Sequence, residues 1–249
     1  MTYTKQTYTI KSAPKPYLFI GSKIRGAFGY SLKEEVCVNP TFECTNCFAA
    51  KECLFYKFYE AQNQTHDYRL DYKLYSEKYK FSLLLFNETQ KEKEVVHKAM
   101  MASLKEYKEI AFKEKTKTLK TKKHAKIIKL EFQTPLRIKK QNRFAIKDIE
   151  LLDILLSIYK RNLELQNLPY KPIVLDTNYK TVSKNLTYQE LTRRSNKQNT
   201  KMNLGGLMGE MVISNLSKEA YDLLKTGEVI GVGKSTVFGL GKIKMEELA

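Results

Sequence analysis

The chain has 249 residues, with 44 Lys and Arg against 27 Asp and Glu and a formal net charge of +17. A chain of this length can bury a real core and form one or two domains. The sequence has no run of about 18 apolar residues and no apolar secretory leader. We therefore expect neither a membrane span nor secretion. We therefore expect a cytoplasmic protein.

The excess of basic residues predicts a polyanionic partner, with nucleic acid first and an anionic membrane surface second. A basic surface that is simply solvated is the alternative. No basic amphipathic helix with an aromatic face stands out, which weakens the membrane option. The 16 Tyr and 12 Phe can fill the core, and some of them can stack on the bases of single-stranded RNA.

The first half opens with strand composition in residues 3–10 and continues with a helix capped by Ser22. Apolar residues spaced by four form the buried stripe of this helix: Ile24, Phe28, Leu32 and Val36. The opposite face carries Gly26, Gly29, Tyr30 and Lys33. Glycine inside a helix costs about 1 kcal/mol relative to alanine. A bulky neighbour on this face would explain the two glycines, and either the second half of the chain or RNA could supply it.

All four cysteines lie between Val36 and Leu54, at positions Cys37, Cys44, Cys47 and Cys53. A cytoplasmic protein is not expected to hold them as disulfides. Four thiolates can close a structural zinc site, with the pair spaced by two residues as its chelating core. An iron–sulfur cluster and free thiols are the alternatives. A closed four-cysteine site leaves no position for water, so we expect no catalysis from it.

The rest of the chain completes two similar patterns. The first half continues with strand residues 74–86, a helix after Asn87 and a lysine-rich stretch at 113–126, which reads as a hairpin or linker. The second half has a strand at 127–132, an amphipathic helix at 147–166, a strand at 205–213 and a short helix from Ser217 to Gly227. Both halves predict the order β-α-β-β-α-β, which is typical of ferredoxin-like (RRM-like) domains.

We therefore expect an α+β protein with two tandem ferredoxin-like domains. The predicted N-terminal domain is 1–126, with a cysteine-rich insertion at 36–58. The predicted C-terminal domain is 127–249, with a glycine-rich loop at 227–242.

The glycine-rich loop contains Gly233, Lys234 and Ser235, the ending of a nucleotide-binding P-loop. That motif requires a glycine five positions before Gly233 and a helix after the serine. Position 228 is Glu228, and the residues that follow Ser235 are β-branched and punctuated by glycine. We therefore do not expect an enzyme that hydrolyses nucleoside triphosphates. A turn, or close approach of another backbone, explains the glycines instead.

Several segments resemble one family. Residues 24–32, the cysteine cluster and residues 54–60 resemble the N-terminal half of CRISPR-associated endoribonucleases that cut precursor CRISPR RNA. Residues 134–137, 193–198, 203–210 and the closing glycines resemble the C-terminal half. The spacing G-x-G-x5-G-x-G is similar to the glycine-rich loop of the repeat-associated (RAMP) superfamily.

The resemblance implies binding of CRISPR repeat RNA and cleavage without a metal by the substrate's own 2′-hydroxyl. The products would be a 2′,3′-cyclic phosphate and a 5′-hydroxyl. This chemistry needs a base, an acid and a cation near the phosphorane. Similar sequences often carry His where this chain has Tyr30, and a phenol is a poor base at pH 7. The catalytic candidates are Tyr30, Lys23, Arg25 and His66.

The resemblance and the basic residues also indicate a set of RNA contacts. The candidates in the glycine-rich loop are Gly231, Gly233, Lys234, Ser235, Thr236, Gly239 and Gly241. A second basic patch consists of Arg193, Arg194, Lys197 and Lys201. His97 is expected to be structural, and His124 is expected in a loop.

Three functions remain open at this point. The first is an endoribonuclease that matures CRISPR RNA, and the second is a catalytically silent RNA-binding subunit of a CRISPR effector complex. The third is a zinc-containing DNA-binding protein, which the resemblance disfavours. Expected partners are CRISPR repeat RNA and CRISPR effector or adaptation proteins, with the chain as a monomer or homodimer.

Overall fold

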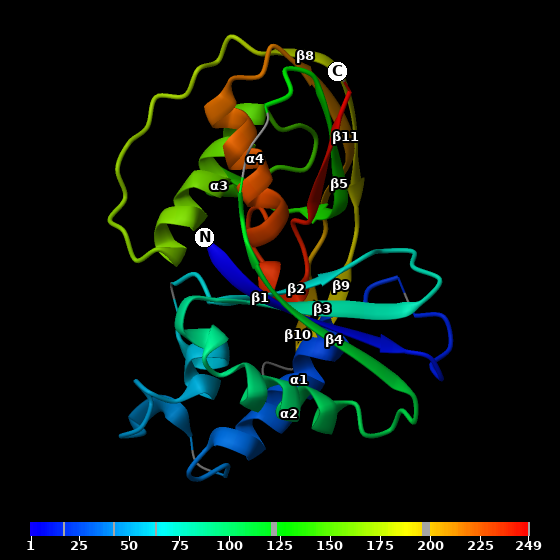
Figure 1. Cartoon of the computed structure of the whole chain (residues 1–249), viewed down its shortest axis with the longest axis vertical. Helices are drawn as coiled ribbons and strands as arrows, with labels where there is room; N and C mark the ends of the chain where they lie inside the picture. The colour runs from blue at the N-terminus through cyan, green and yellow to red at the C-terminus, as the bar shows by residue number, and fades with distance from the viewer. Residues whose placement is uncertain (17, 42, 63, 121–123, 196–199, 249) are drawn as a thin grey trace. The chain divides into compact units, whose positions relative to one another are not determined.

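The computed structural model describes residues 1–16, 18–41, 43–62, 64–120, 124–195 and 200–248. The chain divides into two compact units, Met1–Thr118 and Leu119–Ala249. Each unit forms its own four-stranded sheet, and the mixed α+β composition agrees with the predicted fold class (Figure 1). None of the helices in the described part of the chain combines the length and apolar character that a bilayer crossing requires.

Unit 1 has the element order β-α-β-β-α-β. Its main elements are β1 (Thr2–Ile10), α1 (Gly21–Val36), β2 (Tyr68–Tyr72), β3 (Tyr79–Phe86), α2 (Lys93–Ser103) and β4 (Ile110–Thr118). The sheet order is β2-β3-β1-β4, and β1 pairs antiparallel with both β3 and β4. This order places the first strand in the centre, as in a ferredoxin-like domain.

The alternation of side chains along β1 decides which face of the sheet is covered by helices. Tyr8 is fully buried, its hydroxyl lies 3.1 Å from His97 Nδ1 on α2, and the two rings stack. The neighbours Thr7 and Thr9 point to the opposite face because successive residues of a strand alternate. The helices α1 and α2, which pack on each other, therefore cover the face that carries the even-numbered residues of β1.

The helix α1 forms where its apolar stripe predicts it. Ile24, Phe28 and Leu32 are all buried, whereas the predicted cap Ser22 lies inside the first turn. The helix begins after Ile20, which makes no side-chain capping bond, and ends where the N–H of Cys37 donates to the carbonyl of Lys33. The residues between α1 and β2 contain the 3-10 turn Cys44–Asn46 and the π-helical turn Tyr56–Glu60.

Unit 2 repeats the same element order with two small hairpins added. Its elements are β5 (Ile128–Leu136), β6 (Lys139–Lys140), β7 (Arg143–Phe144), α3 (Leu151–Leu165), β8 (Lys180–Gln189), β9 (Thr192–Ser195), β10 (Thr200–Asn203), β11 (Gly206–Ser214), α4 (Lys218–Ile230) and β12 (Ile243–Glu247). The main sheet has the order β12-β5-β11-β8, with all pairs antiparallel. Two hairpins are formed outside this sheet, one by β6 and β7 and one by β9 and β10.

The helix α4 begins as predicted and ends later than predicted. Ser217 caps it by accepting a bond from the N–H of Ala220, at 3.3 Å. Gly227 was expected to stop the helix, but it lies inside α4 and packs against Ile158 of α3. The helix ends at Ile230, and Gly231 follows with a positive φ of 79°. The close approach of α3 and α4 explains Gly227, because a methyl group there would lie 2.6 Å from the Ile158 Cδ1 atom.

Two other expectations about local structure need correction. The lysine-rich stretch at 113–126 is not only a connection, because residues up to Thr118 form the edge strand β4. The predicted strand 74–86 begins at Tyr79, after a turn in which Tyr75 has a positive φ of 55°.

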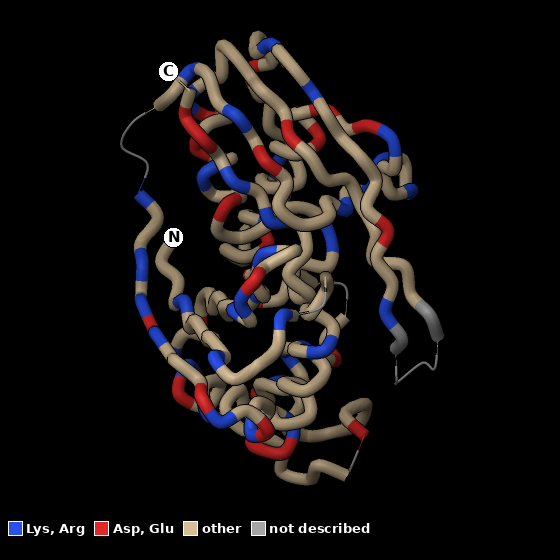
Figure 2. Tube along the Cα trace, turned by 90° about the vertical axis from the view of Figure 1, so that its right-hand side faces the viewer, with Lys and Arg blue, Asp and Glu red and all other residues tan. Residues whose placement is uncertain are grey.

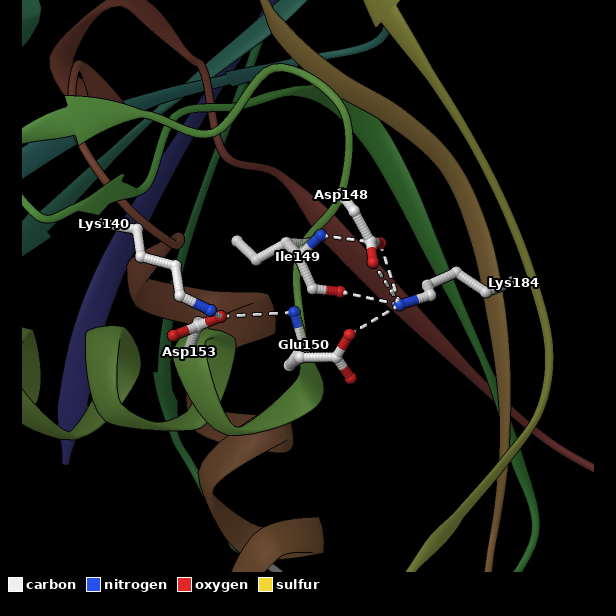
Figure 3. A network of polar contacts seen from close by, with 6 residues as sticks. All are labelled: Lys140, Asp148, Ile149, Glu150, Asp153 and Lys184. Atoms are coloured by element: carbon white, nitrogen blue, oxygen red, sulfur yellow. Dashed lines mark hydrogen bonds and ion pairs between the residues drawn. The ribbon is translucent and has the colours of Figure 1, made fainter.

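A network of charges fixes the start of α3 to β8 (Figure 3). The ammonium of Lys184 contacts carboxylate oxygens of Asp148 at 2.8 Å and Glu150 at 2.9 Å. Glu150 caps α3 together with Asp153, which also pairs with Lys140 of β6 at 3.4 Å. The network therefore ties together β8, the first turn of α3 and the β6–β7 hairpin.

We expect Lys184→Met to lower the free energy of unfolding by about 1 kcal/mol at pH 7, because two carboxylates lose one shared cation. The bond from Lys184 is the largest cause of the lowered pKa of Asp148. A carboxyl with a lowered pKa stabilises the fold above its unfolded pKa of about 4 and loses this effect as the pH falls. Urea unfolding should show a difference between wild type and variant that shrinks below about pH 4. The control Lys218→Met removes an exposed pair with Asp222 and should cost under about 0.5 kcal/mol.

Candidate nucleic-acid interface

The outer face of α1 is exposed. Lys23, Gly26, Ala27 and Tyr30 are all exposed and recur at the spacing of one helix face. Tyr30 is 70% exposed. Tyr30 lies seven positions after Lys23, so their backbones lie about 10 Å apart along the helix. Between the cation and the phenol, this face presents only a glycine and an alanine.

Gly26 and Gly29 have different explanations. A methyl group at Gly29 would lie 2.5 Å from the ring of Tyr59, so this glycine is required by packing within unit 1. A methyl group at Gly26 would meet none of the described atoms within 4 Å. The fold therefore accounts for Gly29 and leaves Gly26 without a structural reason, although it costs helix stability.

The hydroxyl of Tyr30 interacts with Glu34, one turn further along α1. The hydrogen bond to Glu34 is the largest cause of the raised pKa of Tyr30, followed by the negative charge of that carboxylate. A phenol with a raised pKa is neutral at pH 7 and can donate a proton or a hydrogen bond. It is not suited to accept a proton from a 2′-hydroxyl.

Arg25 points to the inside of unit 1. Its guanidinium carbon lies 4.2 Å from the ring centroid of Tyr59, and its nitrogens donate to Tyr68 Oη at 3.0 Å and to the carbonyl of Phe58 at 3.3 Å. Tyr59 returns a bond of 2.6 Å to the carbonyl of Arg25. The arginine thus holds the π-helical turn against α1, a positioning role that differs from the direct catalytic role expected from the sequence.

The three histidines lie in three environments. His66 Nδ1 is 3.0 Å from the carbonyl of Lys57, at the edge of the same π-helical turn. His97 is stacked on Phe112 with ring centroids 3.9 Å apart, and burial lowers its pKa, in agreement with a structural role. His124 Nε2 contacts the carbonyl of Leu216 at 2.6 Å within unit 2.

The predicted metal site is not supported. All four cysteines are partly exposed free thiols: Cys37, Cys44, Cys47 and Cys53. Within the described residues, no group of three or more His, Cys, Asp or Glu side chains could hold a metal ion. Burial is the largest cause of the raised pKa of Cys44, and Glu60 adds to it, which opposes the thiolate form. Cys44 and Cys47 share a 3-10 turn, and Cys37 and Cys53 are close enough to contribute to the raised pKa of Cys44. The described residues therefore do not support the zinc and iron–sulfur expectations.

In unit 2, the glycine-rich segment Gly231–Gly241 is bonded to the end of β5. The N–H of Gly241 donates to the carbonyl of Pro135 at 3.0 Å, and the N–H of Lys234 donates to the carbonyl of Arg137 at 2.8 Å. Thr134 Oγ1 donates to the carbonyl of Gly239 and accepts from the N–H of Lys242. Residues 134–137 thus serve as a backbone support for the segment.

The glycines of the segment are explained by these close backbone contacts. A methyl group at Gly241 would lie 1.8 Å from the carbonyl oxygen of Val232, and one at Gly233 would lie 2.4 Å from that of Arg137. Both residues also have positive φ, 68° and 75°. The N–H groups of all four glycines donate to protein acceptors: Gly231 to Gly227, Gly233 to Ser157, Gly239 to Thr236 and Gly241 to Pro135. The approaching backbone is therefore the protein's own.

These bonds decide which parts of the segment face outward. Lys234 is exposed and Ser235 is half-buried in the left-handed conformation, whereas Thr236 is buried. The only predicted contacts with accessible side chains in this segment are therefore Lys234 and Ser235, among the described residues.

The second basic patch lies on the β9–β10 hairpin. The guanidinium carbon of Arg193 is 4.5 Å from the ring centroid of Phe238, so the hairpin packs on the glycine-rich segment. Arg194 and Lys201 are paired in register, and Lys197 lies outside the described residues. The structure therefore brings together two basic segments that lie about 40 residues apart in the sequence.

A third basic element was missed. The β6–β7 hairpin carries exposed Lys139, Lys140 and Arg143, and its turn residues Gln141 and Asn142 both have positive φ. Arg137 connects this hairpin to the glycine-rich segment through its carbonyl, while its side chain donates to Gly205 and packs over Phe144. The run of cations around a Gln-Asn pair was the signal that could have predicted a hairpin.

The fold consists of two ferredoxin-like units that carry exposed basic residues. Residues 130–243 match the family model described as "CRISPR-associated endoribonuclease Cas6", and a second family model, described as an N-terminal domain, matches residues 7–102. This match agrees with the resemblance noted in the sequence: residues 130–243, a little under half of the chain, are similar to the Cas6 endoribonucleases.

Solved structures share this fold over the whole chain. Cas6 (TTHB231) from Thermus thermophilus is 15% identical, with a TM-score of 0.59, and covers 99% of this chain and 98% of its own. "An RAMP protein binding different RNA substrates" is 12% identical, with a TM-score of 0.53 and coverage of 99% and 100%. A chain of a "Cas6-RT-Cas1--Cas2 complex" is 13% identical, with a TM-score of 0.57, and covers 99% of this chain and 29% of its own. No match was found among curated proteins.

Proposed function

We propose that the chain matures CRISPR RNA by cutting precursor transcripts within their repeats. The observation that carries this proposal is the endoribonuclease family match over residues 130–243, together with an exposed face on α1 that bears a phenol and a cation. The reaction needs no metal. The substrate's 2′-hydroxyl attacks the adjacent phosphorus and the bond to the 5′-oxygen breaks, which leaves a 2′,3′-cyclic phosphate and a 5′-hydroxyl.

The outer face of α1 supplies two of the groups for this reaction. Tyr30, neutral at pH 7 because its pKa is raised, donates a proton to the leaving 5′-oxygen. Lys23 compensates the negative charge that develops on the phosphorane. Gly26, which lies between them and carries no side chain, lets a phosphodiester lie against the helix.

His66 accepts the proton of the 2′-hydroxyl. A carbonyl can only accept a hydrogen bond, so the contact with Lys57 places a proton on Nδ1 of His66. With Nδ1 protonated in this way, Nε2 is the ring nitrogen that accepts the proton of the 2′-hydroxyl. Arg25 positions the turn that bears Lys57, because it donates to the carbonyl of the next residue, Phe58.

Unit 2 binds the RNA backbone through its basic segments. Lys234 and Ser235 of the glycine-rich segment contact phosphates with their side chains, and the glycines shape the loop that presents them. Arg193 and the cations of the β6–β7 hairpin extend the positive surface. Adaptation or effector proteins are further expected partners, in line with the Cas6-RT-Cas1--Cas2 assembly among the relatives.

Incubation of the purified chain with a transcript that contains CRISPR repeats, in excess EDTA, tests the proposal. We expect one cut in each repeat, with a cyclic phosphate on the upstream product and a hydroxyl on the downstream product. Cleavage that stops in EDTA and returns with a divalent metal would contradict the metal-independent chemistry.

A second candidate is a catalytically silent RNA-binding subunit. The raised pKa of Tyr30 favours it, since this residue stands where similar sequences often carry a histidine base. Tight repeat binding with intact RNA after long incubation would establish this candidate and exclude the nuclease.

Gly26→Ala should separate stability from function. The added methyl group meets none of the described atoms within 4 Å, so the variant should unfold at a higher temperature, with a gain of up to about 1 kcal/mol. Cleavage should nevertheless become roughly tenfold slower, because the methyl group occupies the space proposed for the phosphodiester. If cleavage by the stabilised variant is as fast as that of wild type, RNA does not lie on this face.

A further inference from the structure

The edge strand β4 carries a row of lysines that have no role in the proposed reaction. The strand lies outside the residues that the two family models match. Lys113, Lys115 and Lys117 are all exposed. They alternate with Phe112, Glu114 and Thr116, so they share one face of the strand. The blue positions of Figure 2 follow this strand up to the undescribed residues 121–123.

The two faces of β4 have opposite roles. On one face, Phe112 stacks on His97, Glu114 pairs with Lys93 at 2.7 Å, and Thr116 contacts Thr4 at 3.2 Å. This is the face that the helices cover. The three lysines point to the opposite side of the sheet, and no ion pair among the described residues includes any of them.

The placement of Lys115 is unfavourable for an isolated fold. In the β1–β4 register, Lys115 stands directly opposite Lys5, and like charges in such a pair destabilise a sheet. Lys5 has Asp71 as its partner at 2.8 Å, which leaves the charge of Lys115 uncompensated by any pair in the described chain. An external anion would remove this cost.

The spacing of the lysines fits a polyanion. Residues two apart on a strand are about 6.7 Å apart, so the row spans about 13 Å. Successive phosphates of an extended nucleic-acid strand recur at a comparable distance. Lysines on an edge strand also prevent pairing with strands of other molecules. That role does not make the affinity for RNA depend on these lysines, and it does not require them to share one face.

We infer that Lys113, Lys115 and Lys117 form a sequence-independent track for the backbone of the RNA substrate on unit 1. This inference rests on the proposed function for the identity of the polyanion. The track anchors a single-stranded portion of the transcript on the sheet face opposite to α1, and it contributes affinity without taking part in cleavage. Three phosphates are neutralised along it.

Titration of labelled repeat RNA with the full chain tests the track. Three phosphate contacts contribute about 2 to the slope of log K against log salt and about 100-fold in affinity at 0.1 M salt. The variant K113Q/K115Q/K117Q should lose this contribution to the slope and this contribution to the affinity. The variant K113R/K115R/K117R keeps the charges and should retain the slope and most of the affinity.

A matched control separates a local track from net charge. Lys73, Lys105 and Lys108 are also exposed residues of unit 1, and K73Q/K105Q/K108Q changes the net charge equally. Equal losses in the two glutamine variants, no loss in the β4 variant, or no RNA binding by wild type would overturn the inference. Unchanged thermal unfolding of the β4 variant shows that a loss is not caused by misfolding.

The two proposals fail in different ways. Wild type that binds repeat RNA without cutting it, with the affinity dependent on the β4 lysines, refutes the proposed nuclease and keeps the track. Wild type that cuts, with the K113Q/K115Q/K117Q variant binding equally well, refutes the track and keeps the nuclease.

Discussion

Tyr30→Phe is expected to slow single-turnover cleavage of repeat RNA by about 100-fold, the lower range for loss of a proton donor. The variant removes one oxygen from a side chain that is 70% exposed, so the fold and the affinity for RNA should not change. The effect should therefore appear in the rate constant at saturating enzyme. Quenched time courses with labelled RNA measure it directly.

The pH dependence gives a second readout of the same residue. Glu34 raises the pKa of Tyr30, so the proton donor persists above the ordinary phenol range. Wild-type cleavage should not fall as the pH approaches 10, and the effect of the substitution should stay constant from neutral pH upward until Tyr30 ionises. The control Tyr170→Phe changes a tyrosine of unit 2 that is also mostly exposed, and this variant should cleave at the wild-type rate. An unchanged rate for Tyr30→Phe would remove this residue from the mechanism.

Gly241→Ala is expected to destabilise unit 2 by about 3 kcal/mol or more. A methyl group would lie 1.8 Å from the carbonyl oxygen of Val232, and the φ of 68° is strained for any residue with a side chain. The N–H of Val232 donates to the carbonyl of Gly241 itself, so relief of the clash breaks the contact that closes the loop. Thermal and urea unfolding should show an early transition.

The comparison with Gly26→Ala makes this prediction specific. Both variants add one methyl group to a glycine. The methyl group of Gly241→Ala meets a backbone carbonyl, whereas that of Gly26→Ala meets none of the described atoms within 4 Å. Opposite changes in unfolding temperature are expected. Wild-type stability of Gly241→Ala would show that the loop does not adopt the described conformation.

The element order was predictable because local patterns and the fold agree. The apolar stripe of α1 and the serine cap of α4 both form where the sequence indicates. Gly227 was misread because a helical glycine can serve close packing as well as helix termination, and only the position of Ile158 distinguishes the two. The strand β4 was missed because its lysines resemble a solvated linker until the pairing with β1 is known.

The candidate site was predictable in part. Tyr30 and Lys23 share an exposed helix face, as their spacing implies, whereas the direction of Arg25 depends on Tyr59, which follows 34 positions later in the chain. The glycine-rich segment was recognisable, but its acceptors on residues 134–137 are distant in sequence. Cysteine spacing suggested a metal site, but spacing alone does not determine whether four thiols adopt the geometry that a metal ion requires.

Substitution of the 2′-hydroxyl at the cut site by hydrogen is the most direct measurement of the central claim. The nucleophile is proposed to be this hydroxyl, so a repeat RNA with one 2′-deoxynucleotide there should bind with the wild-type affinity and remain uncut. A repeat with the deoxynucleotide one position away should be cut normally. Cleavage of the modified site at the unmodified rate would contradict the proposed mechanism.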